Sequence, residues 1–174
     1  MKLKTTFLSA GLLIGLIACQ QSQESSNSSE KATLTLTFNG KTKTYTDASI
    51  SEGKLGSIVS IGITAGSSGA DYLSLTAYGD QAGTYPYKQD IGNYTQVSQV
   101  EYKINGTVFN NYFTLICPDK SGYSSSKGEI KITEYTPGKH AKGTFSGALF
   151  DANNEEECKP DSASFNGEFD ITVD

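Results

Sequence analysis

After its N-terminal region, the chain alternates apolar and polar residues with a period of two. In the segment TLTLTF, Leu34, Leu36 and Phe38 fall on one face and threonines fall on the other. Asn39 and Gly40 follow, and a second alternating run, KTKTYT, comes after them. Because Asn-Gly between alternating runs favours a two-residue hairpin turn, the domain is predicted to open with a β-hairpin.

The same alternation returns in further short runs, which clusters of Gly, Ser, Asn and Asp separate. The runs predicted as strands are residues 57–65, 71–78, 100–104, 109–116, 128–135, 143–150 and 167–173. No stretch has the period of an amphipathic helix. About nine short strands with one apolar face predict an all-β fold, a single antiparallel β-sandwich or barrel-like domain.

The N-terminus has the layout of a secretory signal peptide, in which lysines precede an apolar run, here residues 7–18. This run is shorter than the roughly 20 apolar residues that a membrane-spanning helix needs. It ends in Leu16-Ile17-Ala18-Cys19, which resembles the lipobox of bacterial lipoproteins. In such proteins the chain is cut before the cysteine and the thiol is acylated. The resemblance implies a signal peptide over residues 1–18 and lipidation of Cys19.

Residues 19–31 contain the cysteine and a run of Gln, Ser, Asn and Glu. Such a run cannot bury enough apolar surface to fold, so it is predicted to be a flexible tether in front of a domain over residues 32–174. Each acyl methylene buried in the bilayer contributes about 0.8 kcal/mol, so acyl chains on Cys19 supply the membrane anchor. Because Gln20 rather than aspartate follows the cysteine, the lipoprotein resemblance implies the outer membrane, on either face.

The charge of the chain narrows the possible partners. The formal net charge is −5, and every one of the basic side chains is lysine. Binding to nucleic acid needs clustered positive charge, so we expect no nucleic-acid partner. Bidentate recognition of phosphate or carboxylate usually relies on arginine. Because the chain has none, we expect no anionic ligand.

Two cysteines, Cys117 and Cys158, lie within the predicted domain. In an exported protein they are most simply a disulfide, which would contribute roughly 3–4 kcal/mol. Two free thiols or a metal site are the alternatives. A zinc site needs four ligands, and His140 is the single histidine.

No catalytic set emerges from the motifs, and we expect no enzymatic activity. The segment GTFSG places its serine one position too late for a nucleophile elbow, and His140 lies in a predicted turn. The acidic segment DANNEEEC offers Asp151, Asn153 and Glu155 as oxygen ligands for calcium. A solvated acidic loop is the alternative, because the spacing is not that of an EF-hand. No other cofactor is indicated.

Tyrosines are the most suggestive side chains for binding. In YGDQAGTYPYKQDIGNY, Tyr85, Tyr87 and Tyr94 lie among Gly, Asp and Gln, where they could contact a glycan or a protein. The alternative is that these rings cap the core. Farther along, Asp161-Ser162-Ala163 resembles the short O-glycosylation sequon of Bacteroidota, which implies a glycan on Ser162.

The segments GEIKITEY, KGTFSGALFD and FNGEFDITV resemble a C-terminal pattern of small Bacteroidota-type lipoproteins of unknown function. Together with the lipobox, the resemblance implies a β-rich, lipid-anchored envelope domain without assigned catalytic residues. We therefore expect a non-enzymatic binding or interaction module whose ligand is a glycan or a protein. A lipocalin-like carrier, with a cavity for a small apolar ligand, is the alternative.

Overall fold

A computed structural model describes residues 32–67, 69–87, 97–116, 121–152 and 161–173 of the chain. These residues form an all-β fold, as the alternation predicts. The strands are β1 (Ala32–Phe38), β2 (Lys41–Tyr45), β3 (Ser49–Leu55), β4 (Ile58–Gly66), β5 (Tyr72–Ala77), β6 (Gly83–Pro86), β7 (Gln99–Ile104), β8 (Thr107–Asn110), β9 (Tyr112–Ile116), β10 (Ser121–Ser125), β11 (Gly128–Thr136), β12 (His140–Asp151) and β13 (Ser162–Thr172). Within the described ranges, no helix has the length and apolar character to cross a bilayer.

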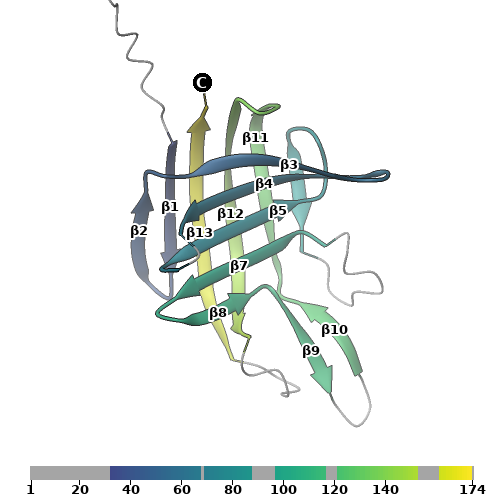
Figure 1. Ribbon diagram of the computed structural model, residues 1–174. Coiled ribbons are helices and arrows are strands. Elements are labelled where there is room, and N and C mark those ends of the chain that lie inside the picture. The colour runs from purple at the N-terminus through teal and green to yellow at the C-terminus, as the bar shows by residue number, and fades with distance from the viewer. Residues whose placement is uncertain (1–31, 68, 88–96, 117–120, 153–160, 174) are drawn as a thin grey trace, which may run out of the picture.

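Eleven strands form one antiparallel sheet. Its main path runs β2-β1-β13-β12-β8-β7-β5-β4-β3, while β11 pairs with β12 and β6 pairs with β11. The sheet curls so that β3, β4, β5 and β7 lie across β1, β13 and β12 (Figure 1). The strands β9 and β10 form a separate hairpin. The result is a half-barrel of two crossed layers, which confirms the predicted barrel-like antiparallel fold.

The long strand β12 belongs to both layers. Its first part, His140–Gly147, pairs with β11, and its last two residues, Phe150 and Asp151, pair with β8. Backbone hydrogen bonds therefore join the layers along this strand. Among the described residues, a side-chain hydrogen bond from Tyr135 of β11 to Glu52 of β3 also connects the two layers.

The core lies between the two layers and is built from the apolar face that the alternation predicts. Its largest fully buried side chains are Tyr102, Phe145, Phe165, Phe169, Leu34, Leu36, Ile61, Ile63, Leu73, Leu75, Ile130 and Ile132. Full burial of an aliphatic or aromatic side chain of this size stabilises the fold by about 1.5–3 kcal/mol. These side chains fill the interior, while the clefts that described residues line open to the solvent.

The opening hairpin is confirmed in detail. Phe38 pairs with Lys41 across a two-residue turn. Both turn residues have positive φ angles, 47° at Asn39 and 76° at Gly40. This geometry matches the right-handed twist of the flanking strands, and Asn-Gly adopts it at little cost.

The prediction of one strand over residues 109–116 is wrong, because the structure interrupts it at Asn111. This side chain is fully buried. The amide N of Val100 donates to Asn111 Oδ1 at 2.8 Å, and Asn111 Nδ2 donates to the carbonyl O of Ser98 at 2.8 Å. The side chain thus takes the place of a backbone partner beside β7, so β8 ends there and β9 departs from the sheet.

Strand β3 was not among the predicted runs. Its sequence, SISEGKL, is exposed at almost every position. The strand forms because it pairs with all of β4 from Ile58 to Thr64, not because it has an apolar face.

Candidate functional site

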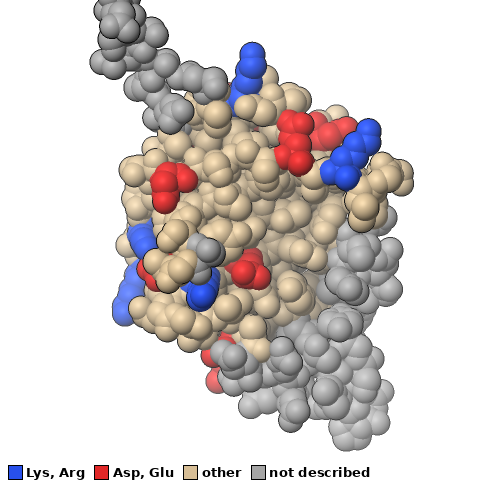
Figure 2. Space-filling view, viewed as in Figure 1, with Lys and Arg blue, Asp and Glu red and all other residues tan. Residues whose placement is uncertain are grey.

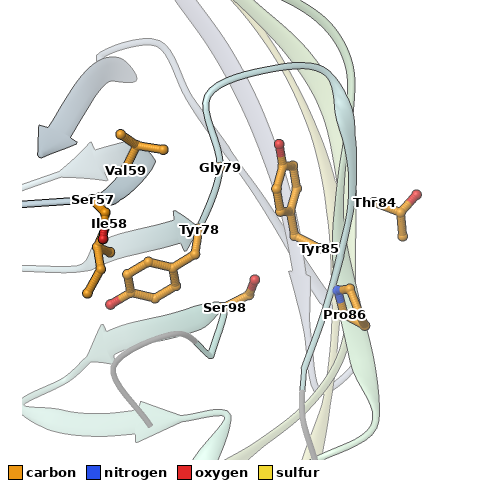
Figure 3. Close-up of a pocket in the computed structure, with 9 residues that line it drawn as sticks. All are labelled: Ser57, Ile58, Val59, Tyr78, Gly79, Thr84, Tyr85, Pro86 and Ser98. Atoms are coloured by element: carbon orange, nitrogen blue, oxygen red, sulfur yellow. The ribbon is translucent and has the colours of Figure 1, made fainter. Parts of the chain in front are cut away.

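A cleft of about 400 Å³ opens on the side of the half-barrel where β5 leads into β6. Ligand pockets commonly measure roughly 300–1,000 Å³, so the cleft has the size of a small-ligand site. It is lined by Ser57, Ile58, Val59, Tyr78, Gly79, Thr84, Tyr85, Pro86 and Ser98 (Figure 3).

Tyr85 of β6 forms one wall of the cleft. Its ring lies so close to Gly79 that a Cβ atom added there would be 2.5 Å from Tyr85 Cε1. Its hydroxyl donates to the carbonyl O of Gln81 at 2.6 Å. Partial burial raises the pKa of Tyr85, so the hydroxyl stays neutral. The segment between β5 and β6 therefore holds this ring in one orientation.

The opposite wall comes from β4 and from the end of β5. Figure 3 shows the ring of Tyr78 directed toward Ile58, and the hydroxyl of Ser98 pointing up between the two tyrosines. Ser98 is buried, and its carbonyl accepts the hydrogen bond from Asn111. The residue that interrupts the predicted strand thus also positions the floor of the cleft.

Among the described residues, the lining of the cleft carries no formal charge. Its side chains are hydroxyls, aromatic rings and aliphatic groups. The side chain of Thr84 points away from the other lining side chains (Figure 3). A neutral ligand that has both hydroxyl groups and an apolar face would match this chemistry.

A second cleft, of about 300 Å³, lies beside the first. Its lining is Glu52, Gly53, Lys54, Val59, Ser60, Asp80, Tyr135 and Pro137. The hydroxyl of Tyr135 donates to Glu52 Oε1 at 3.0 Å, which connects β11 in one layer to β3 in the other. Burial, followed by the hydrogen bond and charge of Glu52, raises the pKa of Tyr135 to about 12.

The structure separates the tyrosines that the sequence singled out. Tyr85 lines the first cleft, whereas Tyr87 is buried in the core and 6% exposed. The ring of Tyr87 lies against Gly128 and Gly147, and its hydroxyl has no hydrogen-bond partner among the described residues. Tyr94 lies outside the described residues. Tyr87 therefore fits the alternative interpretation of a core residue.

Two further candidates have described positions. Asp151 ends β12 and is partly buried, and Ser162 begins β13 and is exposed. The remaining sequence candidates lie outside the described residues, and they are Cys19, Cys117, Cys158, Asn153 and Glu155. The lipidation, the disulfide and the calcium site stay predictions. The described residues contain no group of three or more His, Cys, Asp or Glu side chains arranged to hold a metal.

His140 was expected in a turn, but it begins β12 and is half-buried. Its Nε2 atom lies 3.4 Å from Asp170 Oδ1, and Lys142 Nζ lies 3.4 Å from Asp170 Oδ2. The three side chains form a small ionic cluster. Elsewhere on the face in Figure 2, lysines and acidic residues are scattered and form no basic patch.

Tyr78 opens the tyrosine-rich segment YGDQAGTYPYKQDIGNY that the sequence singled out, but Ser98 and Tyr135 were not recognised as site residues. Tyr135 ends an alternating run, where nothing distinguishes a tyrosine that caps a strand from one that faces a cleft. Nothing in the sequence around Ser98 marks it as a site residue. Tyr78 and Ser98 line the first cleft and Tyr135 lines the second, although the three come from different parts of the chain.

No model of a known protein family matches this chain, and no curated protein matches it at a significant level. The geometry of the cleft, together with the sequence, therefore carries the functional argument.

Proposed function

We propose that the protein is a lipid-anchored, non-enzymatic binding module of the bacterial outer membrane, and that its ligand is a neutral glycan. The observation that carries the proposal is the cleft between Tyr78 and Tyr85, whose described lining has no charged side chain and places the Ser98 hydroxyl between the two rings. A tyrosine ring packs against the C–H face of a sugar, while neighbouring hydroxyls exchange hydrogen bonds with the sugar hydroxyls.

A glycan fits better than a protein partner because the aromatic rings are recessed. Protein interfaces usually centre on exposed aromatic or aliphatic anchors. Among the described residues, Leu55 is the one large hydrophobic side chain that is exposed, at 78%, and it lies at the end of β3. One isolated leucine is a small anchor for a protein interface, whereas the cleft has the size of a small ligand.

The lipid anchor is supported by the sequence alone, through the match of Leu16–Cys19 to a lipobox and the polar run that follows. A tether over residues 19–31 would span at most about 45 Å when extended. The domain would then stand off the membrane surface with its cleft accessible. A carrier function would need an enclosed apolar cavity, and the packed interior between the described strands gives that alternative no support.

The proposal is tested with the full chain, produced with its anchor and held in detergent micelles. Binding to an array of neutral glycans is followed by calorimetric titration of the strongest ligand. Replacing Tyr78 with alanine should weaken binding about tenfold, equivalent to ~1.4 kcal/mol. Tyr72→Ala is the matched control, because Tyr72 lies on β5 outside the cleft. If no neutral glycan binds, or if both variants weaken binding equally, the proposed function is wrong.

A further inference from the structure

The two clefts are neighbours on the surface and share a lining residue. The segment that leads from β5 to β6 passes between them, so that Gly79 lines the first cleft and Asp80 lines the second. Val59 of β4 lines both. The electrostatic influence of both Asp80 and Tyr85 on the hydroxyl of Tyr135 shows that the two compartments are close together.

The two compartments differ in charge. The described lining of the first has no charged residue, whereas that of the second includes Glu52, Asp80 and Lys54. Carboxylates are strong acceptors for hydroxyl donors, and such charge-assisted hydrogen bonds are roughly twice as strong as neutral ones. One oxygen of Glu52 already accepts from Tyr135, which fixes the direction of the carboxylate.

We infer that the two clefts form one groove for a chain of neutral sugars. One sugar unit lies between Tyr78 and Tyr85, and the next unit crosses Val59 to reach Glu52 and Tyr135. The inference rests on the proposed function and adds a substrate class to it, namely neutral oligosaccharides rather than single sugars. A chain of uronic acids is disfavoured, because its carboxylates would face Glu52 and Asp80.

The test measures how affinity depends on chain length. The probes are glucose and N-acetylglucosamine oligomers, from the monosaccharide to the hexasaccharide, titrated against the full chain in detergent micelles. In at least one series the affinity should rise about tenfold as the second unit is added, and then level off. Glu52→Gln should remove this rise, since glutamine keeps the size of the side chain but not its charge.

Two tyrosine variants make the comparison specific. Tyr135→Phe removes the hydroxyl that holds Glu52, so the gain from the second unit should fall. Tyr72→Phe makes the same chemical change on β5, outside both clefts, and should leave the gain intact. Both changes are conservative, and a urea unfolding curve for each variant shows that a lost gain does not come from a lost fold.

The outcomes separate the inference from the proposed function. If affinity does not depend on chain length, or if Glu52→Gln keeps the gain, the extended groove is wrong while binding at Tyr78 still stands. An equal gain with galacturonic acid oligomers would also overturn it. If none of the neutral glycans binds at any length, the proposed function and the groove both fail.

Discussion

Phe169 of β13 lies directly opposite Gly143 of β12, and its ring occupies the space that a side chain at Gly143 would need. A Cβ atom at Gly143 would be 2.7 Å from Phe169 Cζ. The next inward-facing pair reverses the arrangement, with Phe145 opposite Gly167 and its ring over that glycine. Each ring covers the backbone of the neighbouring strand, a known way to stabilise glycine within a sheet.

These pairs predict that a methyl group added at either glycine destabilises the fold. Gly143→Ala or Gly167→Ala should lower the free energy of unfolding by about 2–3 kcal/mol, because the new methyl group meets both a ring and a backbone carbonyl. Gly69→Ala is the control, since a Cβ atom there has open space. Urea unfolding of the three variants measures the effect. Equal stability of all three would show that the Phe–Gly packing is not as described.

Asn111 predicts a second sensitive position. Asn111→Ala leaves the amide of Val100 and the carbonyl of Ser98 without their partners, which should cost about 2–4 kcal/mol of unfolding free energy. Asn111→Asp keeps an acceptor for Val100 but places a charge in the core, so it should be at least as destabilising. Thermal and urea unfolding measure both variants. A loss below about 0.5 kcal/mol for both would contradict the bridging role.

The buried hydroxyl of Tyr87 is predicted to be dispensable for stability. Because its buried hydroxyl has no partner among the described residues, Tyr87→Phe should leave stability unchanged or raise it by up to about 1 kcal/mol. Tyr87→Ala should instead cost about 3–5 kcal/mol, since the ring packs on Gly128 and Gly147. Tyr85→Phe is the comparison, because its hydroxyl donates to Gln81. A large loss with Tyr87→Phe, measured by urea unfolding, would reveal a partner for the hydroxyl.

Alkaline pH should destabilise the fold through its tyrosines. Burial raises the pKa values of Tyr45, Tyr102 and Tyr135, the last to about 12, so the folded state keeps these protons after the unfolded chain has lost them. Their contribution to stability is complete below the ordinary tyrosine pKa of about 10 and is lost as the pH rises through the folded-state values. Tyrosinate absorbance and unfolding curves measure this loss. Tyr135→Phe should make the decline less steep, and an unchanged slope would contradict the assignment.

The proposed lipid anchor predicts that a substitution at Cys19 changes where the protein is found in the cell. In a bacterial host, Cys19→Ser should abolish the incorporation of labelled palmitate and move the protein out of the membrane fraction, because the acylated thiol is lost. Ser162→Ala provides a control that leaves the lipobox intact. Membrane association of the Cys19→Ser protein at the original level would show that another feature holds it there.

The alternation along β1 was enough to place Leu34 and Leu36 in the core, because one side of that strand is buried. It could not place Tyr85 and Tyr87, which lie two positions apart on the same side of an extended segment. One faces the cleft and the other faces the core, since β6 ends between them at Pro86. Which neighbour each ring meets depends on the pairing of β6 with β11, and a pairing between distant segments leaves no mark in local sequence.

The candidate site was less predictable than the core for the same reason. Tyr78 and Ser98 line one cleft and Tyr135 lines its neighbour, because the curl of the sheet brings together segments that are distant in the sequence. The interruption at Asn111 also escaped, because a polar residue inside an apolar run is compatible with either a strand or a break. Its buried hydrogen bonds to Val100 and Ser98 decide the outcome, and these partners lie on β7 and directly before it.

The position of β1 between β2 and β13 has a consequence for biogenesis. Ala32 pairs with Ile171, so β1, the earliest strand described, is bonded to β13, which follows the other twelve along the chain. Contacts of such long sequence separation form slowly, because the whole intervening chain must first be brought together. Until β13 arrives, the opening hairpin would have an unpaired edge, which other chains can join. If the protein is anchored as we propose, copies held close together on a membrane would be protected from one another once β13 covers this edge.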